Sequence, residues 1–330
     1  MERKTLTANY LCTINWFGNT IIDWGSAGKQ YFIDGQIKEL HKYHHTLNFD
    51  GSINSADGKY AFIYQKLGTK GLLLKEGELL REINRTYYCS NVYEYPAAFV
   101  TVNDITYLIH CPISYCQLDF ENVETGEIVT NIPGRDADDV FYSRLEISND
   151  NKFLLSKGWF WHPWDLLHVF NIEECLKNPV LLDRSVLRPY TRAEVCTASF
   201  IDNTRILMGS SDEPADDEDD EDDKANTFHN NFPPKHIAIW DLETNQISKS
   251  VKVNGEFGNL FAIDENRAWD MYLFPKIINI HTGEIIDSDE SIDSGKQNSA
   301  ICGKSPQIVF NRQTKQIAIA GHEKIEVLTP

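Results

Sequence analysis

The feature that most constrains the fold is a β-hairpin pattern that returns along almost the whole chain. Each copy has a run of β-forming residues, a tight turn with glycine or asparagine, and a second such run. Glycine and asparagine supply the positive φ angle that a two-residue hairpin turn requires. The turns of five clear copies centre on Gly35, Gly77, Gly126, Asn245 and Gly283. A looser copy, with a longer turn, leads from residues 167–172 to residues 180–182.

A second unit lies between these hairpins and consists of a polar turn that feeds a strand. Its copies are residues 55–62, 148–155, 201–207, 263–269 and 311–320. Each of these turns joins a preceding strand to a following one, so one repeat contains two hairpins and therefore four strands. Successive four-stranded repeats along a chain are typical of β-propellers.

The two ends of the chain predict how the ring closes. The last segment carries three strands, at residues 307–311, 316–320 and 324–328, whereas residues 4–8 precede the first complete repeat. The simplest closure is that the N-terminal strand completes the last repeat, which makes seven blades and leaves no free edge at the seam. We therefore predict one all-β domain over residues 1–330, a seven-bladed β-propeller of four-stranded antiparallel blades. A pair of β-sandwich domains is the structural alternative.

Two details of the repeats resemble the WD-repeat family. The Ile-Trp-Asp run of residues 239–241 stands before a hairpin turn, and the Ser-Ala-Asp-Gly-Lys run of residues 55–59 has variants in other repeats. The likeness covers nearly the whole chain as a repeat pattern, but a single blade has the Trp-Asp pair. The family's Gly-His dipeptide is missing from the repeat starts, since Gly321-His322 follows a strand. The resemblance implies protein or peptide partners on the face formed by loops between blades and between the second and third strands.

Charge and composition exclude several classes of function. Acidic residues number 49 against 31 basic ones, a net charge of −18, and such a surface repels the phosphate backbone of nucleic acids. No apolar run approaches the ~18 residues of a membrane span. Residues 1–5 lack the apolar region of a secretory signal. We expect a cytoplasmic protein that binds neither nucleic acid nor membrane.

The sequence contains no recognisable catalytic or metal-binding motif. Its seven cysteines are irregularly spaced, which favours reduced thiols packed as small apolar side chains. Cys111 and Cys116 lie close together, but without a second pair they are a weak metal signal. Hydrolase, nucleotide-binding and zinc-protease motifs are absent from the sequence. We therefore predict no cofactor and no metal site, and assign no catalytic residue.

The strongest candidate for a binding site is the aromatic run of residues 158–165 in the fourth blade. It holds three of the seven tryptophans, and tryptophan is the residue most enriched at binding hot spots. Pro163 should interrupt strand pairing and make this end of the hairpin loop-like. The predicted binding residues are Trp159, Phe160, Trp161, His162 and Trp164, with Tyr190 and Arg192 from the approach to the fifth blade. Packing of some of these rings between blades is the alternative.

Two further segments are candidates for a contact surface. Residues 212–223 contain ten acidic residues out of twelve, inside an insertion over residues 211–235 that self-repulsion should keep flexible. Asp216, Asp217, Glu218, Asp219 and Asp220 would form a handle for a basic partner, or else a solvated insertion. The tyrosine-rich residues 87–95 suit either an adaptable binding surface or packing between blades.

These features favour a protein-interaction module, a scaffold or adaptor, that binds a protein or peptide on its loop face. Trp159, Trp161 and Trp164 would grip the partner, and the acidic insertion would tune the contact with a basic one. A propeller enzyme with a polar site in the central funnel, acting on a sugar or a small acid, is the second hypothesis. An acidic neutralising partner of a basic toxin is the third.

Overall fold

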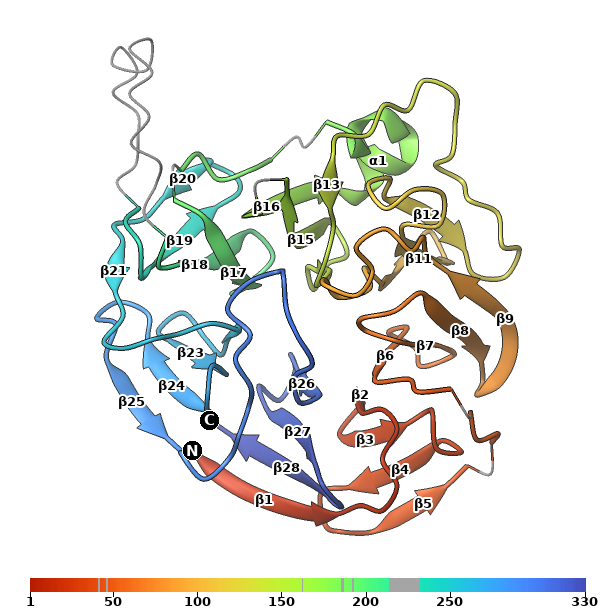
Figure 1. The fold of residues 1–330 in the computed structure, drawn as a ribbon, viewed down its shortest axis with the longest axis horizontal. Coiled ribbons are helices and arrows are strands. Elements are labelled where there is room, and N and C mark those ends of the chain that lie inside the picture. The colour runs from red at the N-terminus through yellow and green to blue at the C-terminus, as the bar shows by residue number, and fades with distance from the viewer. Residues whose placement is uncertain (41, 46, 162, 185–186, 192, 214–231) are drawn as a thin grey trace.

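β-Strands form nearly all regular structure in the computed structural model, which describes residues 1–330 except 41, 46, 162, 185–186, 192 and 214–231. Seven antiparallel sheets are arranged around a central axis like the blades of a propeller (Figure 1). Each sheet buries its apolar face against the next sheet: Ile22 and Trp24 of the first blade, for example, pack with Ala61 and Ile63 of the second. The predicted fold class is confirmed, and the alternative of two β-sandwiches is excluded.

The first two blades are regular four-stranded sheets whose strands follow one another from the centre of the ring outwards. Blade 1 holds β2 (Asn15–Phe17), β3 (Thr20–Asp23), β4 (Lys29–Phe32) and β5 (Ile37–Glu39). Blade 2 holds β6 (Gly51–Asn54), β7 (Tyr60–Tyr64), β8 (Lys70–Lys75) and β9 (Glu78–Asn84). The second strand β7 is buried along its whole length, whereas the outermost strand β5 is exposed along its whole length.

Blades 3 and 4 are less regular than the first two blades. Blade 3 holds β10 (Ala98–Val102), β11 (Ile105–His110) and β12 (Asp119–Asn122), and a bridge from Glu121 to Ile128 marks its outer edge. In blade 4, the short strands β13 (Val140–Phe141) and β14 (Glu146–Ile147) share the innermost position beside β15 (Phe153–Phe160), and β16 (Trp164–Asn171) follows.

The outer edge of blade 4 corrects the sequence prediction of a strand at residues 180–182. Helix α1 (Ile172–Lys177) and the 3₁₀ helix η1 (Pro179–Leu182) occupy this stretch. The side chain of Asn171 caps α1 by accepting from the backbone N–H of Glu174, and proline opens η1. These are the usual signals for helix starts, and here they outweigh the apolar run.

The last three blades complete the ring. Blade 5 holds β17 (Val195–Phe200), β18 (Arg205–Ser210) and β19 (His236–Asp241), with β20 (Gln246–Ile247) and β21 (Val251–Lys252) both paired to β19. Blade 6 holds β22 (Leu260–Ala262), β23 (Arg267–Asp270), β24 (Lys276–Asn279) and β25 (Ile285–Ser288). Blade 7 holds β26 (Ile308–Phe310), β27 (Ile317–Gly321), β28 (Lys324–Thr329) and β1 (Glu2–Thr7).

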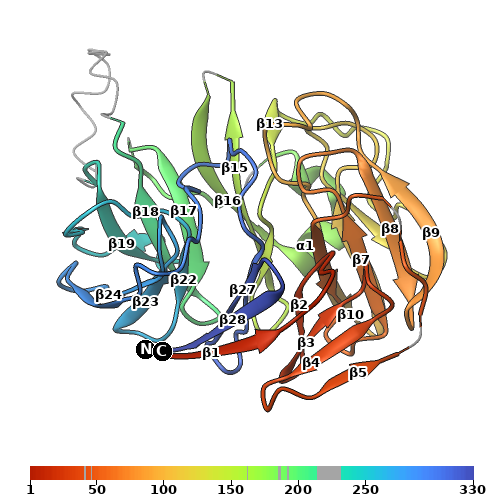
Figure 2. The same cartoon turned by 60° about the horizontal axis from the view of Figure 1, so that its bottom comes forward.

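The N-terminal strand closes the ring as the sequence predicts. β1 pairs antiparallel with β28 from Glu2 opposite Thr329 to Thr7 opposite Lys324, so it begins two residues earlier than residues 4–8. The two chain ends lie side by side at the seam (Figures 1 and 2). Leu6 points into the core and is 3% exposed, which ties the first residues of the chain to the last blade.

The turn chemistry of the predicted hairpins is also confirmed. The φ angle is positive at all five predicted turn positions: Gly35 (94°), Gly77 (79°), Gly126 (76°), Asn245 (54°) and Gly283 (72°). At Gly283 the backbone also approaches a neighbour, because an added Cβ would lie 1.9 Å from the carbonyl oxygen of Lys252. In the described residues, no helix has both the length and the apolar character needed to cross a membrane.

Candidate functional site

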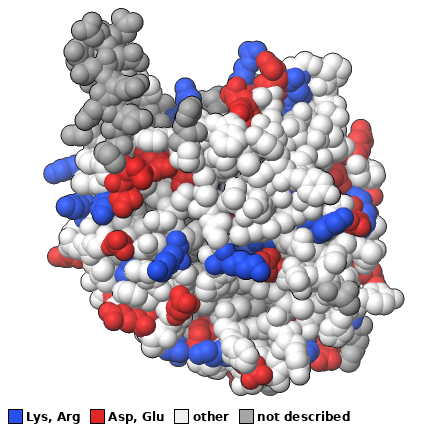
Figure 3. Space-filling model, viewed as in Figure 1, with Lys and Arg blue, Asp and Glu red and all other residues white. Residues whose placement is uncertain are grey.

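One face of the ring collects the loops between blades and those between second and third strands, and we call it the loop face. It includes residues 85–97, 111–118, 130–139, 161 and 163, and both ends of the acidic insertion. A long loop between β25 and β26 also lies there, and its residues 293–306 run to the centre of the ring and back (Figure 1). We call residues 293–306 the crossing segment. On this face, Figure 3 shows a broad uncharged area over blades 3 and 4.

The β15–β16 hairpin carries the predicted aromatic run and rises above its neighbours on this face (Figure 2). Its strands pair without a break from Phe153 opposite Asn171 to Phe160 opposite Trp164. Pro163 therefore does not interrupt the pairing, contrary to the sequence prediction. It falls in the turn beyond the last pair, where a missing backbone N–H costs the ladder nothing. The hairpin consequently presents Trp161 at its tip.

Five rings from four loop-face segments form a group that we call the aromatic cluster: Tyr88, Tyr115, Phe141, Trp159 and Trp161. Phe141 and Trp159 stack nearly parallel with centroids 3.9 Å apart, and Tyr115 stacks on Phe141 at 4.7 Å. Trp161 stands perpendicular to Trp159 at 5.5 Å. Tyr88 lies 4.6 Å from Tyr115 and 6.2 Å from Trp161. Stacked and edge-to-face pairs at these distances stabilise each other beyond simple burial.

Exposure divides the aromatic cluster into a buried base and an exposed surface. Trp159 is 2% exposed and Phe141 is fully buried, whereas Trp161 is 42% and Tyr88 46% exposed. The sequence predicts that Trp159 contacts a partner directly. The buried ring has almost no surface available for such a contact. The Trp159 ring instead supports Trp161. Phe160 is 39% exposed.

The close stack of Phe141 on Trp159 depends on Gly158. A Cβ at this position would lie 2.3 Å from the carbonyl oxygen of Phe141, a distance that no real Cβ contact tolerates. Any larger residue would therefore push β13 away from β15 and separate the two rings.

Arg85 holds the loop that carries Tyr88. Its Nη2 donates to the carbonyl oxygens of Ser90 at 2.7 Å and Tyr93 at 2.9 Å, and its guanidinium lies over the rings of Tyr93 and Tyr95. The tyrosine-rich segment thus combines both roles that the sequence left open, since Tyr93 and Tyr95 are buried while Tyr88 is exposed. A loop held in one conformation loses little entropy on binding.

A groove beside the hairpin brings together three more of the predicted residues. Phe160, Trp164 and Tyr190 line a cavity of about 260 Å³. His168 lies in its wall, and burial, with a smaller effect of Arg188, lowers the pKa of this histidine to about 3. The imidazole is therefore neutral at physiological pH. The predicted residues His162, Arg192, Asp216, Asp217, Glu218, Asp219 and Asp220 lie outside the described residues.

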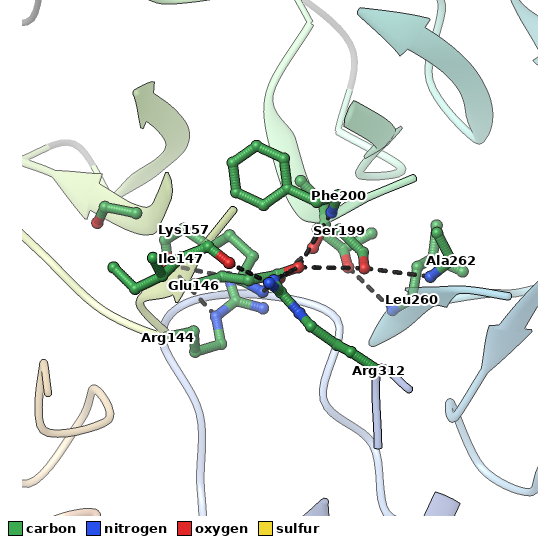
Figure 4. Close-up of polar contacts among 12 residues, drawn as sticks. Arg144, Glu146, Ile147, Lys157, Ser199, Phe200, Leu260, Ala262 and Arg312 are labelled. Atoms are coloured by element: carbon green, nitrogen blue, oxygen red, sulfur yellow. Dashed lines mark hydrogen bonds and ion pairs between the residues drawn. The ribbon is translucent and has the colours of Figure 1, made fainter. Parts of the chain in front are cut away.

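The wall of the central channel holds a second concentration of polar groups (Figure 4). Glu146 on β14 accepts from Nζ of Lys157 at 2.8 Å, from Arg312, and from the backbone N–H of Phe200 at 3.0 Å. Burial by itself would raise the pKa of Glu146, but Lys157 and Arg312 lower it to about 2. Because this carboxylate stays ionised and fully engaged, it is poorly suited to general acid–base catalysis.

The described residues contain no group of three or more His, Cys, Asp or Glu side chains placed to hold a metal ion. All seven cysteines are free thiols.

Several residues of these sites escaped the sequence analysis. Tyr115 and Phe141 carry no local signal, because each is a single aromatic residue in its own segment. Arg144, Glu146 and Arg312 are equally isolated, and the tertiary fold brings them together from positions up to 168 residues apart. A pattern search along the chain has no access to such groupings.

The fold defines a class, the seven-bladed β-propellers. A chain of the solved structure titled "Crystal Structure of Mitotic Checkpoint Complex" matches with a TM-score of 0.58 and 11% sequence identity. The match covers 99% of this protein and 94% of that chain. Because 857 solved chains match in all, the likeness identifies the fold and selects no partner. Neither a protein-family model nor a curated protein matches the sequence.

Proposed function

We propose that this protein is an interaction module that binds a protein or peptide on its loop face. The observation that carries the proposal is the exposure of Trp161 and Tyr88 on a base of buried, stacked rings. Large aromatic side chains dominate the binding energy of many interfaces. A rigid base reduces the entropy that such rings lose when a partner orders them.

Exposed apolar side chains on neighbouring segments add to the surface formed by Trp161 and Tyr88. Ile113 is 48% exposed and belongs to the same loop as Tyr115, and Ile301 is 36% exposed and bridges to Tyr93. Exposed apolar side chains that gather in one area are typical of contact sites. The solved neighbour is part of a protein complex according to its title, which is consistent with protein partners for this propeller.

The test compares Trp161→Ala with wild type on a partner captured by crosslinking in native lysate and then purified. Loss of a hot-spot side chain costs about 2 kcal/mol or more, so Kd should rise roughly 30-fold. The matched control is Tyr10→Ala, because Tyr10 is 88% exposed and lies on the loop between the last and first blades. Both variants should keep the wild-type Tm. Equal affinity of wild type and Trp161→Ala would overturn the proposal that Trp161 binds the partner.

We propose further that the partner is basic and that the encounter takes place in the cytoplasm. The net charge of −18 and the acidic residues 212–223 would speed association with a positive surface more than they tighten the complex. The free thiols suit a reducing compartment.

In the same binding assay, association should slow with added salt, and a Gly/Ser linker in place of residues 212–223 should remove much of this salt dependence. Salt-insensitive association of wild type would contradict a basic partner, and fractionation of cells tests the compartment.

A further inference from the structure

The central channel carries positive charge that its own side chains do not balance. Three cations, Arg144, Lys157 and Arg312, surround Glu146 (Figure 4). Over the whole cavity lining, these three cations and Lys66 face the three carboxylates of Asp50, Glu94 and Glu146, which leaves a surplus of one positive charge. Lys157 and Arg312 both form ion pairs with Glu146. Glu146 therefore pairs with two cations, and Arg144 forms no ion pair with it.

Arg144 has no carboxylate within 4 Å among the residues that the structure describes. Its Nη2 donates to the carbonyl oxygens of Lys157 at 3.2 Å and Cys196 at 2.9 Å. Its Nη1 is buried and has no hydrogen-bond partner in the described part of the chain. The backbone of Arg144 is also strained, with φ at +46°, and a conformation of this kind persists where the surroundings enforce it.

The remaining acidic groups near Arg144 are directed elsewhere. Both carboxylate oxygens of Asp165 lie 3.0 Å from the backbone N–H of Ala300 in the crossing segment. Glu94 accepts from the Tyr64 hydroxyl at 3.2 Å and forms a long ion pair of 3.9 Å with Lys66. Neither carboxylate therefore satisfies Nη1 of Arg144.

A cavity adjoins these groups and has room for a small molecule. It measures about 260 Å³ and is walled by the innermost strands of several blades, with Arg144, Lys157 and Arg312 in its lining. At ~30 Å³ for each water, this space corresponds to about nine water molecules. Gln297 and Pro306 of the crossing segment border it on the loop face. The space suits a small metabolite and not a polypeptide.

We propose that this cavity binds a small anion, whose carboxylate or phosphate group pairs with the guanidinium of Arg144 in the cavity wall. Such a group neutralises the surplus positive charge through charge-assisted hydrogen bonds. This site is separate from the aromatic cluster, and the proposal does not depend on the protein partner.

The test is calorimetric titration of the 330-residue protein at constant ionic strength with succinate, inorganic phosphate and succinamide, the neutral isostere of succinate. We expect saturable binding of succinate or phosphate and none of succinamide. The succinate and phosphate arms distinguish a carboxylate ligand from a phosphate ligand. Equal binding of succinamide, or no binding of either anion, would overturn the proposal without recourse to any variant.

Variants locate the site. Arg144→Gln should weaken anion binding about tenfold or more, the value of a lost charged hydrogen bond, and Arg144→Lys should restore part of the affinity. The matched control Arg267→Gln removes an arginine that pairs with Asp264 at the protein surface and should bind like wild type. Trp161→Ala should also bind anions normally, which separates this site from the partner site. Unchanged affinity in a folded Arg144→Gln would place the anion elsewhere and overturn the assignment.

Discussion

At the scale of single residues, Glu146 shows how a buried charge becomes part of the framework. It links β14 of blade 4 to Phe200 at the end of β17 and to Arg312 in the loop after β26. Three blades thus meet at one carboxylate across the channel. Removing such a group leaves Lys157 as an unpaired buried cation, which is far more costly than the pair itself is stabilising.

We expect Glu146→Gln to lower the free energy of unfolding at pH 7 by about 3–5 kcal/mol. The pKa of Glu146 is depressed to about 2 from 4.5. Its contribution to stability is therefore complete above pH 4.5 and is lost as the pH falls from about 4.5 to about 2. Denaturant unfolding measured over this range should show the loss in wild type and not in the variant.

The matched control is Glu173→Gln on helix α1, where the ion pair with Lys177 is exposed. An exposed pair of this kind contributes little to stability, so this variant should follow the wild-type pH profile. Parallel profiles for Glu146→Gln and wild type would contradict the role assigned to the channel carboxylate.

At the scale of elements, the crossing segment links the aromatic cluster to the central cavity. Ala300 packs in one buried group with Tyr93, Phe141 and Trp159, while Gln297 borders the cavity. Asp165 on β16 holds the segment through the backbone N–H of Ala300. The conformation of this single loop therefore depends on the long β15–β16 hairpin.

Asp165→Asn tests this attachment through its pH dependence. Burial raises the pKa of Asp165 to about 7, with Arg144 opposing and Glu194 reinforcing the shift. An acid with a raised folded-state pKa makes the protein less stable as the pH rises from about 4 to about 7, by up to about 4 kcal/mol. The variant should lack this decline in unfolding free energy, since its amide carries no charge and can still accept from Ala300. An identical decline in the variant would mean that Asp165 does not titrate in this range.

At the scale of the whole molecule, the seam between β1 and β28 determines whether the ring is closed. β1 adds the outermost strand of blade 7 and buries Leu6. It also brings Arg3 to Glu326, with Nη2 and Oε1 2.9 Å apart. A closed ring leaves no unpaired sheet edge at the junction of its ends.

Deletion of residues 2–8 should lower Tm by about 5 °C or more. Loss of the Leu6 side chain alone costs about 2–5 kcal/mol, and each kcal/mol corresponds to roughly 2 °C in a chain of this size. The matched control is Lys4→Ala, because Lys4 is exposed on the same strand, and its Tm should not change. An unchanged Tm after the deletion, measured by calorimetry, would contradict closure by β1.

The sequence by itself determined the number of blades, the turn positions and the closing strand. These features follow from local chemistry, since glycine and asparagine tolerate positive φ and alternating runs predict strands wherever the segment lies. Even the error at residues 180–182 is local, because a capping Asn171 and Pro179 were available signals for the helices.

Only the tertiary structure decided which tryptophan faces solvent and which charges meet in the channel. Trp159 and Trp161 are two residues apart, yet Phe141 of another strand covers the first and leaves the second exposed. Likewise, Arg144 forms no ion pair among the described residues, and the carboxylate of Glu146 pairs with Lys157 and Arg312 instead. Burial and charge balance depend on neighbours that are distant along the chain, and local residue patterns carry no information about them.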